Sequence, residues 1–175
     1  MKIFGPIEKK PTFAELLADC TTSAVHLEIH DAHMTSDPGF IAFKAGRDFI
    51  NHAQAHAWVD VVAPAVARGV AVRRARIVSE PVSDYTRYMH AVAPAFQLAA
   101  GEQLRWLPRH LSSALALPGN PYWVFDNRLV RFSVFDGAGE VVGHQFSDDP
   151  RVVELCATAF EAVWNLAIPH DEYRL

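Results

Sequence analysis

The stretch YWVFDNRLVRFSVFDGAGEVVGHQFSDD, residues 122–149, decides the fold. Its three apolar segments are separated by turn residues, Asp126-Asn127 first and Gly137-Ala138-Gly139 second. Short apolar segments joined by such turns are typical of antiparallel strands. The stretch therefore predicts a C-terminal β-meander.

A closing helix is predicted directly after this meander. Asp148 and Asp149 precede Pro150, which favours a helix start because aspartate caps free backbone N–H groups and proline is tolerated in the first turn. Pro169 is expected to end the helix. The apolar stripe recurs at helical spacing and consists of Val152, Leu155, Cys156, Ala159, Phe160, Val163 and Trp164.

The first two thirds of the chain alternate between helical and strand patterns. Residues 23–31, SAVHLEIHD, alternate apolar and polar side chains, as a strand with one buried face does, with His26, Glu28 and His30 on the polar face. Pro64 is expected to bend or divide its helix. The predicted elements are helix 11–20, strand 23–31, helix 55–68, strand 70–80, helix 83–100 and strand 103–108.

These elements predict a single α/β domain. Strands joined through helices require parallel neighbours of right-handed sense, and the meander adds antiparallel strands, so the sheet should be mixed. A chain of 175 residues fits one domain and buries roughly 70% of its unfolded surface. We expect one domain over residues 1–175, with residues 1–10 as a flexible lead-in.

Composition and charge narrow the class of protein. No apolar run approaches the roughly 18 residues of a membrane helix, and no secretory signal opens the chain, which predicts a cytoplasmic protein without membrane contact. The two cysteines are far apart in sequence and indicate neither a disulfide framework nor a zinc ribbon.

The charge is unevenly distributed along the chain. Residues 68–109 hold seven arginines against three carboxylates, and residues 140–175 hold two arginines against seven carboxylates. This dipole favours self-association, as in a homo-oligomer, or an oppositely charged partner. The net charge of −4 and the absence of a lysine-rich stripe argue against direct nucleic-acid binding.

Several segments carry a resemblance to a known family. SAVHLEIHD, RGVAVRRARIVSEPVSDYTRY, AAGEQLRWLPR, YWVFDNRLVRFSVFD and DDPRVVELCATAFEAVWNLAIPHDEY resemble an actinobacterial family of unassigned function. The resemblance runs from about residue 12 to the end, and RIVSEPVSDY is its most specific block. Such proteins are often encoded beside helix-turn-helix transcriptional regulators. The resemblance therefore implies that a regulator of this kind is the partner.

The closing half also resembles phospholipase D-like domains more distantly, through the meander and a helix with Phe160 and Trp164 in an F-x-x-x-W pattern. The phospholipase D signature requires His-x-Lys, in which the histidine is the nucleophile and the lysine neutralises the phosphate. None of the nine histidines has lysine at the second following position. The resemblance therefore implies a binding or interaction module, and no catalytic residue is predicted.

The arginines are the stronger site signal. Arg73, Arg74 and Arg76 on one strand could converge with Arg87, Arg105 and Arg109 at the strand ends, where open α/β sheets bind ligands. Guanidinium groups hold carboxylates or phosphates through paired hydrogen bonds. Alternatively, Arg74 and Arg76 form ion pairs with Glu80, Asp84 or the acidic C-terminal helix. The candidate ligand or partner site is Arg74, Arg76, Glu80, Asp84, Tyr85, Arg87 and Arg105.

A histidine-based metal site is the weaker hypothesis. His52 and His56, four residues apart on a helix, could bind one metal together with His30 or His33. No glutamate stands at position 53 to act as a base, and surface histidines explain the pattern equally. We predict neither a metal nor another cofactor.

The sequence thus predicts a non-enzymatic regulatory or interaction module that works with a helix-turn-helix regulator. The alternative is a small-anion-binding sensor or an enzyme that uses an Arg/Glu/Asp/Tyr pocket. Trp106, Trp123 and Trp164 lie in apolar periodic segments, and we expect them to be core anchors.

Overall fold

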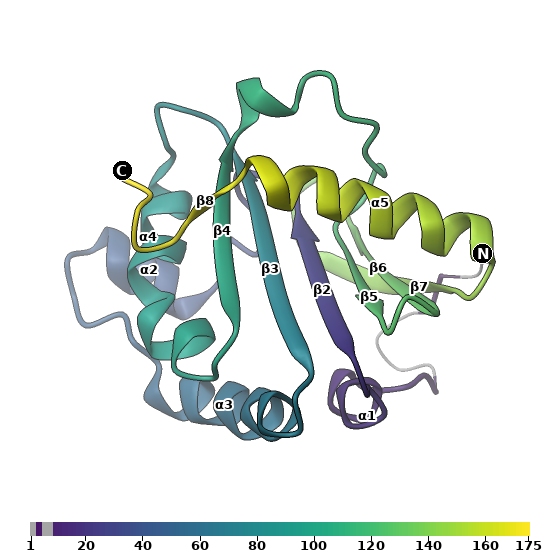
Figure 1. Cartoon of the computed structure of the whole chain (residues 1–175). Helices are drawn as coiled ribbons and strands as arrows, with labels where there is room; N and C mark the ends of the chain where they lie inside the picture. Colours follow the sequence, from purple (N-terminus) through teal and green to yellow (C-terminus); the bar gives the residue numbers. More distant parts are fainter. Residues whose placement is uncertain (1–2, 5–8) are drawn as a thin grey trace.

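The chain folds around one mixed sheet. The computed structural model describes residues 3–4 and 9–175. Helices cover both faces of the sheet, with α5 on one face and α1 and α3 at the other (Figure 1). The eight described strands follow the order β1-β7-β6-β5-β2-β3-β4-β8.

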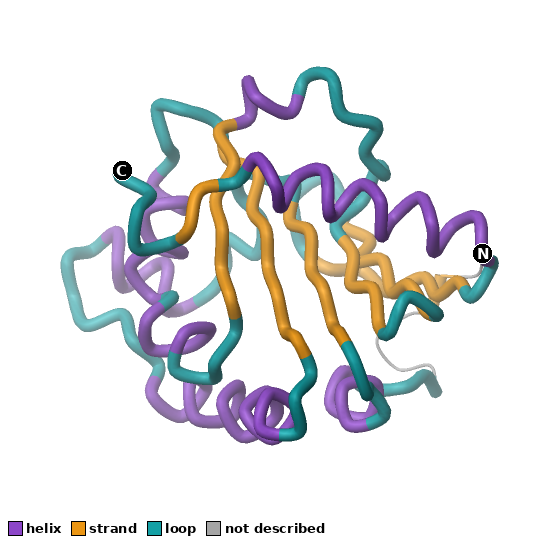
Figure 2. The backbone as a smooth tube through the Cα atoms, viewed as in Figure 1, coloured by secondary structure: helices purple, strands orange, loops and turns teal. Residues whose placement is uncertain are grey.

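The strand arrangement confirms the predicted fold class. The central strands β2, β3 and β4 are parallel, and the other pairings are antiparallel. The predicted meander is present as β5, β6 and β7 (Figure 2). The strands are β1 Ile3–Phe4, β2 Ser23–Glu28, β3 Ala71–Val78, β4 Gln103–Pro108, β5 Tyr122–Phe125, β6 Leu129–Phe135, β7 Val141–Ser147 and β8 Ile168–Pro169.

The helices begin where the sequence provides capping side chains. Ser83 accepts a hydrogen bond from the N–H of Thr86 at the start of α4. Asp149 accepts one from Arg151 ahead of Pro150, as predicted for the closing helix. The helices are α1 Phe13–Ala18, α2 Pro38–Lys44, α3 His52–Ala67, α4 Asp84–Val92 and α5 Pro150–Leu166, with a π-helical turn at Pro94–Leu98 and a 3-10 turn at Arg109–Ser112.

Two helix predictions need correction. Pro64 lies inside α3 but does not divide it, since the helix runs without a break from His52 to Ala67 and Val62 and Ala65, on either side of the proline, are packed in the core. The helix predicted over residues 83–100 stops at Val92 and continues as the π-helical turn, since Pro94 cannot donate a backbone hydrogen bond.

Short elements were missed. Helix α2 and strands β1 and β8 were not predicted, because two or seven residues carry too little periodicity to be recognised. Within the expected lead-in, Ile3 and Phe4 pair with β7, and residues 1–2 and 5–8 lie outside the described residues. Within α5, Leu155 is exposed instead of lining the apolar stripe.

Successive side chains of β3 point to opposite faces of the sheet. Ala75 and Ile77 pack with α5 in the main core, whereas Arg74 and Arg76 point to the face covered by α3 and α4. The three tryptophans expected in the core, Trp106, Trp123 and Trp164, are buried as predicted. In the part of the chain that the structure describes, no helix has the length and apolarity needed to cross a membrane.

Candidate ligand-binding site

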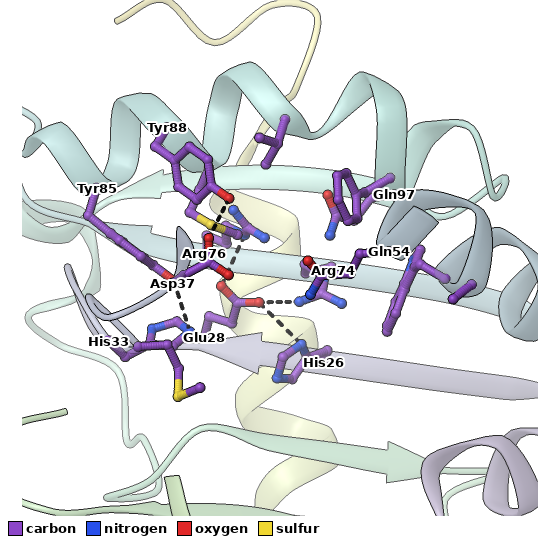
Figure 3. Close-up of a pocket in the computed structure, with 16 residues that line it drawn as sticks. His26, Glu28, His33, Asp37, Gln54, Arg74, Arg76, Tyr85, Tyr88 and Gln97 are labelled. Atoms are coloured by element: carbon purple, nitrogen blue, oxygen red, sulfur yellow. Dashed lines mark hydrogen bonds and ion pairs between the residues drawn. The ribbon is translucent and has the colours of Figure 1, made fainter. Parts of the chain in front are cut away.

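A pocket of about 460 Å³ lies between the sheet and the helices α3 and α4 (Figure 3). Strands β2 and β3 supply its charged floor, and α3, α4 and the π-helical turn supply its walls. The loop between β2 and α2 contributes the remaining side. The apolar part of the wall comprises Met89, Val92 and Phe96.

The floor of the pocket contains a group of buried charges. Arg74 donates hydrogen bonds to Glu28 and, at 2.6 Å, to Glu102. Its guanidinium lies between the rings of Trp58 and Trp123, at 5.4 and 5.3 Å from their centroids. Arg74 therefore has two carboxylate acceptors and two aromatic partners inside the protein, as expected of a structural ion-pair residue.

Arg76 differs from its neighbour. Only 3% of the residue is exposed, and its Nε lies 3.0 Å from Oε2 of Glu28. None of its three guanidinium nitrogens has a hydrogen-bond partner of suitable geometry among the described residues. Buried donors are almost always paired in proteins, because leaving one unpaired costs roughly 1–3 kcal/mol or more. Arg76 is thus a residue of the pocket lining whose buried donors are not satisfied by the described chain.

Further unpaired polar atoms lie around the same space. Nε1 of Trp58 is a buried donor without a partner in the described chain, and Oε1 of Gln97 is a buried acceptor without one. Nδ1 of His26 and of His33 are also unpaired by hydrogen-bond geometry. The pocket therefore presents both donors and acceptors on a partly apolar surface, as ligand pockets commonly do.

The electrostatics fix the protonation states of these groups. Burial opposes the charge on Glu28, but Arg76 and Arg74 outweigh it and lower the pKa of the carboxyl. Burial, with Arg74, lowers the pKa of His26 well below its ordinary value, and burial also lowers the pKa of His33. Near neutral pH, Glu28 is therefore an anion and both histidines are neutral.

Helices α2 and α4 meet at the mouth of the pocket. Tyr88 donates a hydrogen bond of 2.9 Å to Asp37, the residue that caps α2, and Tyr85 lies 3.3 Å from Nε2 of His33. Burial raises the pKa of both tyrosines, so their hydroxyls stay protonated. These contacts join the β2–α2 loop to α4.

The predicted site residues do not form one cluster. Three of them, Arg74, Arg76 and Tyr85, line the pocket. The expected convergence of arginines at the strand ends does not occur, because alternation along the strands sends them to opposite faces. Outside the pocket, Glu80 accepts a hydrogen bond from Tyr173, Asp84 and Arg87 are exposed on α4, and Arg105 donates to the carbonyl of Trp164 on the α5 face.

The alternative of internal ion pairs named the right arginines, Arg74 and Arg76, and the wrong partners, since Arg76 pairs with Glu28. Arg74 pairs with Glu28 and Glu102 instead of Glu80, Asp84 or the C-terminal helix. It is Arg73 that reaches that helix, at 2.6 Å from Glu161. Glu28 was missed as a site residue. It lies on the same face of its strand as His26, and pairing β2 with β3 places it opposite Arg76. The alternation in the sequence could therefore have indicated Glu28 if the strand pairing had been known.

The histidines of the metal hypothesis are dispersed. His52 and His56 are exposed on α3, and His30 follows the end of β2. Among the described residues, no group of three or more His, Cys, Asp or Glu side chains could hold a metal ion. Cys20 and Cys156 are buried, which raises their thiol pKa values to about 11 and about 12 and leaves them unreactive.

The fold and the pocket define a single-domain mixed α/β protein with buried charges on one face of its sheet. The chain belongs to the family described as Domain of unknown function (DUF6879), which matches residues 11–175. The predicted membership of a family without assigned function is thereby confirmed. Comparison with curated proteins gives no match.

Two solved structures are similar to this chain in fold. One is TrmBL2, an archaeal chromatin protein described as showing a novel mode of DNA binding, with 20% identity and a TM-score of 0.48 over 88% of this chain and 47% of that chain. The chain thus spans about half of that protein. The other is Nuc, a phospholipase D family member from Salmonella typhimurium, with 15% identity and a TM-score of 0.48 over 93% of this chain and 88% of that chain. This is the remote similarity to phospholipase D-like domains that was expected.

Proposed function

We propose that this domain is a regulatory module that binds a small molecule in the pocket between the sheet and α3 and α4. The observation that carries the proposal is Arg76, a buried guanidinium that lines the pocket. It is ion-paired with Glu28, yet none of its three nitrogens forms a hydrogen bond of suitable geometry with a described residue. A ligand that accepts hydrogen bonds from this group removes the cost of leaving these donors without a hydrogen bond.

Binding fits the groups in the pocket better than catalysis does. A general acid or base works best with a pKa near the operating pH. The pKa of Glu28 is lowered by two arginines, against the effect of burial, and the pKa of His26 is lowered by burial and Arg74. Both groups therefore hold one protonation state near neutral pH, which suits a fixed recognition surface.

The resemblance seen in the sequence extends this proposal to a partner. We propose that an actinobacterial helix-turn-helix regulator, encoded beside the family, receives the binding signal, and that the module acts in the cytoplasm without contacting nucleic acid itself. The uneven charge along the chain would also support a homo-oligomer. The interaction role rests on the resemblance, whereas the ligand-binding role rests on Arg76.

Retention of a compound from a cell extract tests the ligand-binding role. The protein is incubated with a small-molecule extract of its host, washed by ultrafiltration and denatured, and the released compounds are identified by mass spectrometry. We expect a compound retained by the native chain and by Arg87→Met, but not by Arg76→Met. Arg87 is a matched control, since it is exposed on α4 outside the pocket lining. Equal retention by all three proteins, or by none, contradicts the proposal.

A further inference from the structure

The charge inside the pocket opposes an anionic ligand. Arg74 and Arg76 supply two positive charges, whereas Glu28, the adjacent Glu102 and Asp37 at the mouth supply three negative ones. The two histidines in the lining are neutral near pH 7. A carboxylate or phosphate would therefore enter a site that already holds at least as much negative as positive charge.

The charged side chains on the floor of the pocket also form ion pairs with one another. Glu28 is shared by both arginines, and Glu102 pairs with Arg74. Arg76 thus retains unused N–H groups but little unbalanced positive charge. Such a guanidinium suits an uncharged acceptor, because a carbonyl oxygen fills the hydrogen bonds without adding a buried charge.

We infer that the ligand is an uncharged molecule with an apolar body and an amide-like group, which accepts hydrogen bonds at Arg76 and carries its own N–H donor. This inference rests on the proposed function and departs from the small-anion alternative raised by the sequence. The unpaired acceptor Oε1 of Gln97 calls for a donor on the ligand, and Nε1 of Trp58 calls for a second acceptor. Met89 and Phe96 provide the apolar wall for the body.

Matched pairs of probes compare an uncharged amide with the corresponding carboxylate. Benzamide and benzoate, nicotinamide and nicotinate, and salicylamide and salicylate have the same ring within each pair, and only the amide is uncharged and carries an N–H donor. The readout is the indole N–H signal of Trp58 in the ¹⁵N-labelled full chain, assigned by loss of that signal in Trp58→Phe. The indole of Trp164, on the α5 face, serves as the internal reference.

We expect amides to shift the Trp58 signal and to bind at least about tenfold more tightly than their carboxylate partners. Arg76→Met should weaken amide binding, and Arg87→Met should leave it unchanged. Tighter binding of the carboxylates would overturn the inference while keeping the pocket as a binding site. If no probe shifts the Trp58 signal, the inference fails, and the proposed function is then judged on the cell-extract experiment alone.

Discussion

The Nε atom of Arg76 lies 3.0 Å from Oε2 of Glu28, yet the guanidinium forms no hydrogen bond of suitable geometry with any described residue. Two positions earlier on the same strand, Arg74 donates hydrogen bonds to both Glu28 and Glu102. Two buried arginines on one strand thus differ in how their hydrogen-bond donors are satisfied. We propose that Arg74 stabilises the fold and that Arg76 binds the ligand.

This difference predicts unequal effects of the same substitution. Arg74→Met leaves Glu28 and Glu102 without their shared partner, and removing one member of a buried ion pair costs about 3–5 kcal/mol of unfolding free energy. Arg76→Met breaks only the ion pair with Glu28, which keeps Arg74 as its partner, and should therefore cost roughly half as much or less. Urea unfolding of both variants at pH 7 measures the two losses. An equal loss would show that Arg76 is as structural as Arg74.

We expect Asp126, in the turn between β5 and β6, to contribute to stability in a pH-dependent way. Asp126, with a φ of 50°, accepts backbone hydrogen bonds from Thr21, Thr22 and Ser23. Burial opposes its charge, but these bonds outweigh burial and hold the pKa of Asp126 below its ordinary value of 3.8. Their stabilisation is therefore present above that value and is lost as the pH falls through the lowered pKa.

The substitution Asp126→Asn isolates this contribution, because asparagine tolerates the same positive φ. We expect a loss of about 2 kcal/mol of unfolding free energy at pH 7, and a smaller difference from the native chain at pH 3. Chemical denaturation at the two pH values checks both. A difference that does not change with pH would mean that the carboxylate charge is unimportant in this turn.

We expect His170, in the C-terminal segment, to lower the stability of the fold in mild acid. Nε1 of Trp106 donates a hydrogen bond of 3.1 Å to Nδ1 of His170. Burial, together with His90, lowers the pKa of His170 to about 4. Between an ordinary pKa of about 6.5 and this value, the unfolded chain binds a proton that the folded chain does not, so stability falls as the pH decreases.

Glutamine at position 170 can still accept from the indole but does not titrate. We therefore expect the melting temperature of His170→Gln to fall less between pH 7 and pH 4.5 than that of the native chain. His144→Gln is a second variant of the same kind, since burial and Arg131 lower the pKa of His144 to about 4. Parallel pH profiles for the native chain and His170→Gln would contradict this assignment.

Where α2 and α4 meet, we expect that only glycine fits at position 39 without displacing a neighbour. A Cβ atom at this position would collide with the hydroxyl of Tyr88 and with Oδ1 of Asp37, which are hydrogen-bonded to each other. Gly39→Ala should therefore displace α2 and cost about 1–3 kcal/mol of stability. Thermal unfolding checks this, with Gly119→Ala as the control, because no heavy atom lies within 4 Å of its added Cβ. Similar stabilities of the two variants would exclude the collision.

Sequence patterns located the elements better than the site. The meander and the start of α5 depend on local signals, the turn at Asp126 and the capping Asp149, and both were predicted. The site depends on strand register, which brings Glu28 beside Arg76 although they are far apart in the chain. Glu102 was missed because nothing in its local sequence indicates burial. Local patterns do not contain these long-range pairings.

The ligand-binding proposal is tested most directly by native mass spectrometry of the full chain purified from its own host. The account predicts a species heavier than the bare chain by the mass of one small molecule, and loss of that species in Arg76→Met. A bare chain, or a complex with a regulator alone and an empty pocket, would contradict the assignment of Arg76 as a ligand-binding residue.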